Sequence, residues 1–542
     1  MPKITIDNQE IEFKPGQTII EAARQAAIDI PHFCWHPSLS VSGNCRICLV
    51  EVEKMPKLVI ACSTPAADGM IVHTKSEKTV HAQNAVMEFL LINHPLDCPI
   101  CDEAGECKLQ DYAYKYSVGA SRYDEKKNEK DKRVSLGPNV MFDQERCISC
   151  SRCIRYCEEV VKEPQLTFVQ RGEHVTIETF PGSELDNPYS MNVIEICPVG
   201  ALTSKEFRFK ARVWDMSFTD TVCPGCARGC NTVMGVRDNK VLRIEPRENL
   251  DVNQYWLCDY GRLETIKNIN DTEVRLGSAK IKTGSAGELI DVDWDEAISH
   301  SLSELRKYKN SEILFVASPF STMEDNYALK KLAKEVFESD NICYIPNIDE
   351  NFGDDLLKKS DMTSNSNGLK LLGINTFTGG NFKAVVVLND DLSRLPGIGK
   401  PETVIELSSY KNNSVSSDVV LPLSTYAEVN GTFVNFQNKV QRIRPAIATL
   451  EQERLIGEFS QSRLDKFGAH NDRWTHGTKL GSRPGWRIIK QLAKAAGNNF
   501  SFENSEEVFM ELSNTIIGMS GYDYDSLGEK GITAGDKVLA EA

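Results

Sequence analysis

Cysteines are concentrated in the first half of this chain, at spacings that suit metal ligands. Of the 17 cysteines in 542 residues, all except Cys343 lie between Cys34 and Cys258. The N-terminus has neither the basic stretch nor the apolar stretch of a secretory signal. Many cysteines in a non-secreted chain indicate metal binding rather than disulfides. We therefore interpret them as thiolate ligands of iron–sulfur clusters, which carry single electrons with little structural rearrangement.

Fifteen of the cysteines and one histidine fall into four sets of four donors. The spacings are C-x10-C-x2-C-x13-C, H-x3-C-x2-C-x5-C, C-x2-C-x2-C with a distant Cys-Pro, and C-x2-C-x3-C-x27-C. The donors are Cys34, Cys45, Cys48 and Cys62 (site 1); His94, Cys98, Cys101 and Cys107 (site 2); Cys147, Cys150, Cys153 and Cys197 (site 3); and Cys223, Cys226, Cys230 and Cys258 (site 4). Four such sites in one chain predict a conductor of electrons.

The elements around site 1 predict a small sheet with one helix. Residues 3–13 alternate polar and apolar side chains, as in a β-hairpin that turns at Asp7-Asn8. Thr18 and Glu21 have the spacing of a capping box, which predicts a helix to about residue 28. With three cysteines on one loop, this pattern is similar to the β-grasp fold of [2Fe–2S] ferredoxins, although its spacing is not the plant type. The alternative is a zinc site, which usually combines two short ligand pairs.

Site 2 follows a predicted amphipathic helix over residues 76–93. The apolar residues expected near one face of this helix are Val80, Ala85, Phe89 and Ile92. His94 then lies at the helix end, four residues before Cys98, where a ligand role is expected. A neutral imidazole in place of a thiolate makes the site less negative, and this raises a cluster's reduction potential, as in Rieske centres.

Site 3 matches half of a two-cluster bacterial ferredoxin pattern. The run CISCSRCIRYC supplies three ligands, and Cys197-Pro198 supplies the fourth. The cysteines of a second cluster are replaced by residues that cannot coordinate as thiolates. These residues are Asn187, Ser190 and Val193. Cys157 is therefore left over, and we interpret it as a buried free thiol.

The rest of the chain predicts a hairpin and then an α/β domain. Gly225 and Gly229 allow a tight loop around site 4, and a hairpin is expected to turn at Asp238-Asn239. Beyond residue 273, predicted strands at 311–318, 383–390 and 403–410 alternate with helices at 293–308 and 323–337, as in a parallel sheet. Cys343 is expected in a core strand. The sequence contains neither G-x-G-x-x-G nor a Walker lysine loop.

The overall charge argues against two classes of partner. The formal net charge is −15, from 77 acidic and 62 basic residues. A nucleic-acid binder would need a basic surface, and so would a protein that docks directly on anionic lipid. No run of about 18 apolar residues occurs, so no membrane span is expected. Because an Arg- and Ser-rich transit peptide is also absent, we expect a bacterial cytoplasmic protein.

The order of the four sites resembles the large iron–sulfur subunit, known as the G subunit, of the proton-pumping NADH:quinone oxidoreductase, respiratory complex I. The resemblance covers about residues 1–270. In addition, residues 418–441 (DVVLPLSTYAEVNGTFVNFQNKVQ) resemble the C-terminal signature of molybdopterin oxidoreductases. The implied fold class is multidomain α+β and α/β. Its domains are a β-grasp [2Fe–2S] domain at 1–78, a His/Cys3 [4Fe–4S] domain at 79–118, a ferredoxin-like [4Fe–4S] domain at 140–212, a molybdoenzyme-type [4Fe–4S] domain at 216–272, and a shortened molybdopterin-oxidoreductase-like α/β domain at 273–542.

The resemblance also implies a function. Sites 1 to 3, with one [2Fe–2S] and two [4Fe–4S] clusters, would relay electrons from the flavin- and NADH-binding subunit toward the quinone-reducing subunits. Site 4 would hold a third [4Fe–4S] cluster off the main path. The partners would be peripheral-arm subunits of complex I, on the cytoplasmic side of the bacterial inner membrane. The chain would be an oxidoreductase subunit with no complete active site of its own.

The region after site 4 is shorter than in molybdoenzymes. We therefore predict that no molybdenum cofactor binds, and we interpret residues 351–373 as the remnant of a deleted region. Three alternatives stay open: the α subunit of an NAD-dependent formate dehydrogenase, a hydrogenase or its electron-input subunit, and a zinc-stapled scaffold. A formate dehydrogenase would need a metal-binding cysteine soon after site 4, and an iron-only hydrogenase would need several more cysteines.

Overall fold

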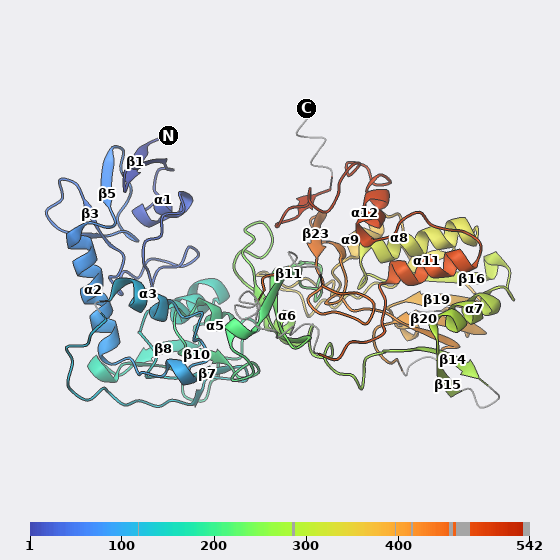
Figure 1. Ribbon diagram of the computed structural model, residues 1–542, viewed down its shortest axis with the longest axis horizontal. Helices are drawn as coiled ribbons and strands as arrows, with labels where there is room; N and C mark the ends of the chain where they lie inside the picture. The colour runs from blue at the N-terminus through green and yellow to red at the C-terminus, as the bar shows by residue number, and fades with distance from the viewer. Residues whose placement is uncertain are drawn as a thin grey trace. The chain divides into compact units, whose positions relative to one another are not determined.

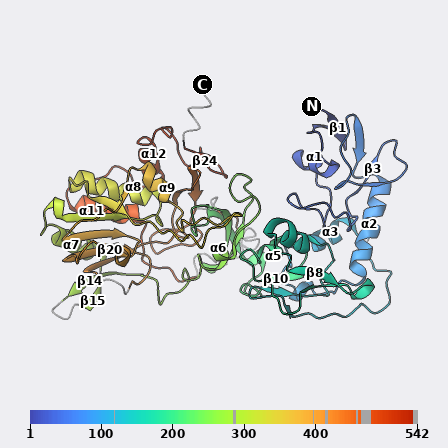
Figure 2. The same ribbon diagram turned by 180° about the vertical axis from the view of Figure 1, so that it is seen from behind.

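The computed structural model describes residues 1–117, 119–283, 288–395, 397–412, 416–454, 459–461 and 477–534. The chain forms two compact units, Met1–Val213 and Trp214–Ala542, which are drawn in Figures 1 and 2. Sites 1 to 3 lie in the first unit and site 4 lies in the second. None of the helices within the described ranges combines the length and apolar character needed to cross a bilayer.

The first unit begins with the expected β-grasp sheet, in the order β2-β1-β5-β3-β4. Its elements are β1 (Lys3–Ile6), β2 (Gln9–Glu12), α1 (Ile19–Gln25), β3 (Leu49–Val52), β4 (Val59–Ile60) and β5 (Met70–His73). Strand β1 pairs antiparallel with β2 and parallel with β5. Asp7 and Asn8 have φ values of 47° and 70°, as a tight two-residue hairpin turn requires. The capping box of Thr18 and Glu21 is confirmed, but α1 ends at Gln25, before the predicted boundary.

The helix before site 2 forms as predicted, but it buries a different face. It is α2 (Glu77–Ile92), and its N-cap is Ser76. The buried residues are Thr79, Gln83 and Met87, whereas Phe89 of the predicted face is 73% exposed. The Gln83 amide donates to the Leu49 carbonyl at 3.2 Å, so a polar side chain is accommodated against β3. The periodicity of apolar residues predicted the wrong face of α2. The face that packs against the protein contains polar residues, which hydrogen bonds to backbone groups stabilise.

Short elements complete the first unit. Its second sheet has the order β10-β7-β6, and β8 and β9 form a separate antiparallel pair. The remaining elements are η1 (Cys98–Ile100), α3 (Lys108–Tyr116), β6 (Val134–Ser135), β7 (Val140–Phe142), α4 (Arg152–Arg155), η2 (Tyr156–Val161), β8 (Leu166–Val169), η3 (Gly172–His174), β9 (Thr176–Thr179), α5 (Asn192–Ile196) and β10 (Leu202–Ser204). The short helix η4 (Val213–Asp215) contains the last residue of this unit and the first two of the second. Most cysteines of sites 2 and 3 lie at or beside the ends of these elements.

The second unit starts with a three-stranded antiparallel sheet that frames site 4. It consists of β11 (Ser217–Val222), β12 (Asn231–Arg237) and β13 (Lys240–Pro246), and α6 (Asp259–Leu263) follows. Asp238 and Asn239 form the predicted turn between β12 and β13, with φ values of 50° and 54°. The loop between β11 and β12 contains Cys223, Cys226 and Cys230.

An eight-stranded sheet forms the core of the second unit, in the order β15-β14-β21-β20-β19-β16-β17-β18. The strands from β21 to β18 are parallel, as predicted, whereas β14 and β15 add an antiparallel edge. The strands are β14 (Ala279–Thr283), β15 (Glu288–Val292), β16 (Ile313–Ala317), β17 (Ile342–Tyr344), β18 (Asn375–Thr376), β19 (Ala384–Leu388), β20 (Thr403–Ser408) and β21 (Val419–Pro422).

Both faces of this sheet are buried. Along β16, Ile313 and Phe315 join the larger core cluster, and Leu314 and Val316 join the smaller one on the other face. In Figure 1, α8 and α11 lie together against the sheet, and α7 also packs against α11. The other elements are α7 (Trp294–Leu305), η5 (Asn310–Glu312), α8 (Met323–Lys331), η6 (Leu332–Val336), α9 (Ser366–Leu371), η7 (Leu392–Arg394), β22 (Gly431–Val434), β23 (Lys439–Ile443), α11 (Gly485–Ala495), α12 (Ser505–Ser513) and β24 (Ile532–Thr533).

A buried ion pair ties the segment after α6 to the α/β core. Arg275 Nη2 lies 2.7 Å from Glu428 Oε2, and the two side chains are only 1% and 2% exposed. Arg275 also donates to the carbonyls of Ile269 and Ser409. Glu428 accepts a further hydrogen bond from the Thr425 backbone N–H at 2.7 Å. Both charges are therefore hydrogen-bonded, which is the condition for an ion pair to be tolerated in a core.

We expect Glu428→Gln to destabilise the second unit by about 3–5 kcal/mol, because it leaves a buried guanidinium without a counter-charge. Urea unfolding of the full chain measures this. The matched control is Glu264→Gln, which breaks an exposed pair with Lys267 and should cost no more than about 1 kcal/mol. Equal unfolding midpoints for Glu428→Gln and the wild type would contradict a structural role for the pair.

Candidate iron–sulfur sites

The four thiols of site 1 lie within interaction distance of one another. Cys34 interacts with Cys45 and Cys62, and Cys62 also interacts with Cys48. The backbone N–H of Cys34 lies 3.5 Å from Cys45 Sγ and donates to it. These contacts lower the pKa values of Cys34 and Cys48 and raise those of Cys45 and Cys62. Loops around β3 and β4 thus bring together all four residues that the sequence assigns to this site.

The four donors of site 2 line one cavity. The complete lining is His94, Asp97, Cys98, Cys101, Ala104, Cys107, Gln110, Arg146 and Gly200. His94 follows the C-cap of α2, and Cys107 is the N-cap of α3. His94 Nδ1 is buried and has no hydrogen-bond partner among the residues that the structure describes. Burial lowers the pKa of His94 to about 4, so the imidazole is neutral, which is the form that binds metals. This orphaned nitrogen and the three thiols fit a metal cluster.

Gly200 gives the site 2 cavity its shape, and the sequence pattern alone did not single it out. A Cβ at this position would lie 2.3 Å from Cys101 Sγ and 2.8 Å from Glu103 Cβ. A side chain would therefore enter the space between the donors. Gly200 comes three residues after Cys197 of site 3, so the chain that closes site 3 also forms a wall of site 2. The sequence shows the glycine after CPV, but it does not show that this glycine lies beside Cys101.

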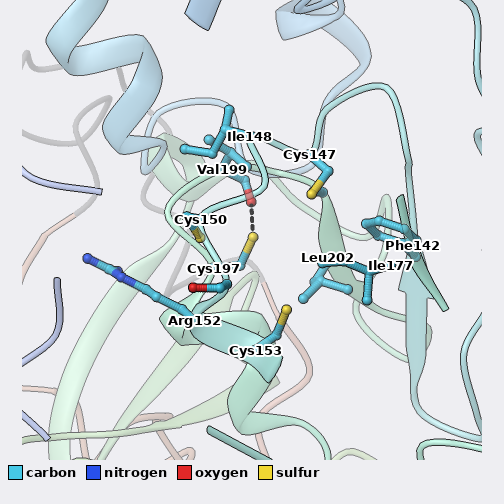
Figure 3. A pocket seen from close by; sticks show the side chains of 12 residues that line it. Phe142, Cys147, Ile148, Cys150, Arg152, Cys153, Ile177, Cys197, Val199 and Leu202 are labelled. Atoms are coloured by element: carbon cyan, nitrogen blue, oxygen red, sulfur yellow. Dashed lines mark hydrogen bonds between the residues drawn. The ribbon is translucent and has the colours of Figure 1, made fainter. Parts of the chain in front are cut away.

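The four cysteines of site 3 also line one pocket, which is shown in Figure 3. The apolar side chains Phe142, Ile177 and Leu202 form part of its wall. The Cys197 thiol donates to the Val199 carbonyl at 3.0 Å, and the Ser149 backbone N–H donates to Cys147 Sγ at 3.4 Å. Burial raises the pKa of Cys147 to about 11, and raises those of Cys153 and Cys197 well above the ordinary thiol value.

Cys157 does not line this pocket. It lies in η2 and is fully buried, and burial raises the pKa of its thiol to about 12. Asn187 is one of the residues that replace the cysteines of a second cluster. Its side chain is buried and hydrogen-bonded to the protein. Its amide donates to Gln165 Oε1 at 2.6 Å and its carbonyl oxygen accepts from the Tyr189 backbone N–H at 3.0 Å. Cys157 thus lies outside the lining of the site 3 pocket, although it is close enough to Cys153 to help raise the pKa of that thiol.

The cysteines of site 4 are all buried. Cys223 and Cys230 close the β11–β12 loop through a backbone hydrogen bond of 2.9 Å, and Cys258 is the N-cap of α6. The Gly261 N–H donates to Cys258 Sγ at 3.3 Å. A Cβ at Gly261 would lie 3.0 Å from Cys223 Sγ, so this helix turn approaches two of the sulfurs closely. Gly229 has a φ of +60°, as the tight loop between the ligands requires.

Part of the segment 351–373 packs on site 4. The Ala227 N–H donates to the Asp361 carbonyl at 2.8 Å. Arg228 donates to the carbonyls of Leu356 and Leu357 at 2.7 and 3.1 Å. Cys343 lies elsewhere, in β17, where it joins the core cluster with Leu314 and Val316. Within the described ranges, no set of three or more His, Cys, Asp or Glu side chains is arranged as a ligand shell for one metal ion.

Four family models match the chain, one over each site. They are described as a 2Fe-2S iron-sulfur cluster binding domain (residues 2–77), an NADH-ubiquinone oxidoreductase-G iron-sulfur binding region (83–122), an NADH-quinone oxidoreductase subunit 3 ferredoxin-like domain (137–203) and a molybdopterin oxidoreductase Fe4S4 domain (216–264). The predicted fold class, with ferredoxin-type domains followed by a molybdoenzyme-type domain, is therefore confirmed.

Curated relatives match about three fifths of the chain. The G subunit of the NADH-quinone oxidoreductase of Rickettsia conorii is 40% identical over 339 residues, which are 62% of this chain and 49% of the relative. The NADH-ubiquinone oxidoreductase 75 kDa subunit of Reclinomonas americana is 40% identical over 62% of this chain and 48% of its own. The mitochondrial NADH dehydrogenase [ubiquinone] iron-sulfur protein 1 of Solanum tuberosum is 39% identical over 63% and 46%. The matched stretch thus spans about half the length of these relatives.

A solved structure of an NAD+-reducing [NiFe]-hydrogenase in the H2-reduced state is also similar. It has a TM-score of 0.36 and 31% identity over 39% of this chain and 91% of that one. The resemblance that the order of the four sites suggested is confirmed: 62% of this chain is similar to the G subunit of bacterial NADH-quinone oxidoreductase, and a stretch of about the same length is similar to its mitochondrial relatives.

Proposed function

We propose that this chain is an iron–sulfur electron-transfer subunit of an NADH:quinone oxidoreductase. Site 1 would hold a [2Fe–2S] cluster, and sites 2, 3 and 4 would each hold a [4Fe–4S] cluster on the sixteen donors named above. Bound clusters supply one-electron chemistry by delocalising charge over iron, sulfide and thiolate. The protein residues hold the donors, exclude water and set the charge around each site.

The observation that carries this proposal is that site 3 adjoins both other sites of the first unit. Arg152 lies between two site 3 ligands and donates to the Trp35 carbonyl, directly after Cys34 of site 1, at 2.5 Å. On the other side, Gly200 adjoins Cys101 of site 2. Residues that adjoin the ligands of site 3 therefore contact residues of sites 1 and 2 or their neighbours in the sequence. We infer that electrons pass from site 1 through site 3 to site 2.

The remaining assignments concern the assembly. We propose that a separate flavin-bearing subunit binds NADH, that other peripheral-arm subunits lead to quinone, and that the whole complex translocates protons. The chain would be peripheral on the cytoplasmic side of a bacterial inner membrane. We also propose that no molybdenum cofactor binds. The core position of Cys343 and the packing of residues 356–361 on site 4 support this.

The function is tested by purifying the chain without oxygen and reducing it in steps, with iron analysis and low-temperature EPR. We expect one [2Fe–2S] and three [4Fe–4S] centres. NADH alone should leave them oxidised, and NADH should reduce them once the flavin-bearing subunit is added. A colourless, zinc-loaded protein would defeat the proposal, and so would oxidation of NADH by the isolated chain.

The assignment of site 3 predicts opposite results for two nearby cysteines. Cys153→Ala should remove one [4Fe–4S] signal and about four iron atoms per chain, because Cys153 lines the pocket. Cys157→Ala removes an equally buried thiol outside the pocket and should leave all four centres intact. Iron counting and EPR on both variants measure this. If the Cys157 variant lost a cluster, the ligand set would be wrong.

The assignment of site 2 predicts that His94→Cys keeps a cluster at a lower reduction potential. A thiolate adds a negative charge where the imidazole was neutral, and negative charge disfavours the added electron. Potentiometric EPR titration measures the shift, and the centres of sites 1, 3 and 4 provide internal references. An unchanged potential at site 2 would count against histidine ligation.

A further inference from the structure

Arg152 is a buried cation that joins the ligand loops of two sites. It is 3% exposed and comes from α4, between Cys150 and Cys153. Nη1 donates to the Ile196 carbonyl at 3.0 Å, and Ile196 directly precedes Cys197 of site 3. Nη2 donates to the Trp35 carbonyl at 2.5 Å, beside Cys34 of site 1. Figure 3 shows the side chain extending away from the centre of the site 3 pocket.

The described part of the chain provides no carboxylate partner for this guanidinium. Among the described residues, no carboxylate forms an ion pair with Arg152, and its buried Nε has no hydrogen-bond partner. After burial, which lowers its pKa, the main influences on the pKa of Arg152 are four thiols, which raise it. These thiols are Cys150 and Cys197 of site 3 and Cys34 and Cys45 of site 1. The groups of opposite charge within its reach are therefore the ligands of two sites.

The surroundings add further positive charge. Arg155, one turn along the same helix, donates to the Cys34 carbonyl at 2.5 Å. Burial and the nearby Arg152 lower the pKa of Lys108 to about 8. A buried charge is costly unless an opposite charge compensates it. Iron–sulfur clusters with four thiolates are net anions, so clusters at sites 1 and 3 would provide that compensation.

Arg146 beside site 2 shows the contrasting arrangement. It is equally buried and lines the site 2 cavity. However, it forms ion pairs with Asp97 at 2.9 Å and with Asp143 at 3.2 Å. Carboxylates of the protein thus balance the charge of Arg146. The charge of Arg152 would be balanced by negatively charged groups bound at sites 1 and 3.

We propose that Arg152 is a positioning residue shared by sites 1 and 3, whose charge raises the reduction potentials of both centres together while its two hydrogen bonds hold the ligand loops side by side. This inference rests on the proposed function, because it needs clusters at both sites. A fixed positive charge stabilises the reduced, more negative state of each cluster. A shared charge moves both reduction potentials in the same direction, so the difference in potential between the two sites changes little.

The test uses the full chain, purified without oxygen, and potentiometric EPR of Arg152→Gln. We expect the reduction equilibria of site 1 and site 3 each to fall by at least about tenfold, which is about 59 mV for one electron. Sites 2 and 4 should keep their potentials. The [2Fe–2S] signal identifies site 1, and the signal that Cys153→Ala removes identifies site 3. The matched control, Arg146→Gln, should leave sites 1 and 3 unchanged.

Arg152→Lys keeps the charge and loses the two-armed hydrogen bonding. We expect this variant to load all four clusters with site 1 and site 3 close to their wild-type potentials. If Arg152→Gln fails to assemble its clusters, the Arg152→Lys variant provides the test. A change in the reduction potential of site 1 or site 3 without a change in the other overturns the proposal. Four loaded clusters in Arg152→Gln with either potential unchanged also overturn it, and leave the electron-transfer function standing. A wild-type chain without clusters would instead remove the proposed function itself.

Discussion

The constraint on which the sites depend is the cost of placing thiolates in a protein interior. Burial raises the pKa of Cys107 and Cys258 to about 12 and that of Cys147 to about 11. With no cation present, such thiols stay protonated at neutral pH. A positive metal centre reverses this balance, because it compensates the negative charge of the thiolates that bind it. The folded chain is thus prepared to bind cations at positions where thiolates alone would be unstable.

Other features of the sites serve the same balance. Backbone N–H groups of Ser149 and Gly261 donate to ligand sulfurs, and these hydrogen bonds favour the thiolate form. Glycine at 200 and 261 lets the backbone come close to sulfur without a side chain in the way. Most of these groups lie in loops or at helix ends, where backbone N–H groups are not used within a helix or a strand.

Much of this arrangement could be predicted from the sequence, because its signals are local. Short cysteine spacings, the turns at Asp7-Asn8 and Asp238-Asn239, and the Ser76 start of α2 all depend on residues that are close along the chain. The alternation of helices and strands likewise predicted the parallel sheet. The antiparallel edge formed by β14 and β15 was not predicted, because pairing between β14 and β21 depends on residues far apart in sequence.

What the sequence could not show is which distant residues meet. Gly200 matters because it adjoins Cys101, and Arg152 because it reaches Trp35, far from it along the chain. The packed face of α2 was wrongly predicted for a similar reason, since Gln83 is buried only because the Leu49 carbonyl lies opposite. In each case the contact that matters is made with a residue from a distant segment, and the local sequence pattern does not show which residue that is.

In the second unit, site 4 and the α/β domain are held together by hydrogen bonds. Site 4 lies between a small antiparallel sheet and residues 356–361, whose carbonyls accept hydrogen bonds from Ala227 and Arg228. The Arg275–Glu428 pair then fixes the segment after α6 to the strands of the α/β core. Without these partners, the β11–β12 loop would carry unsatisfied backbone and guanidinium groups next to its cysteines. The α/β domain therefore contributes to the packing around site 4.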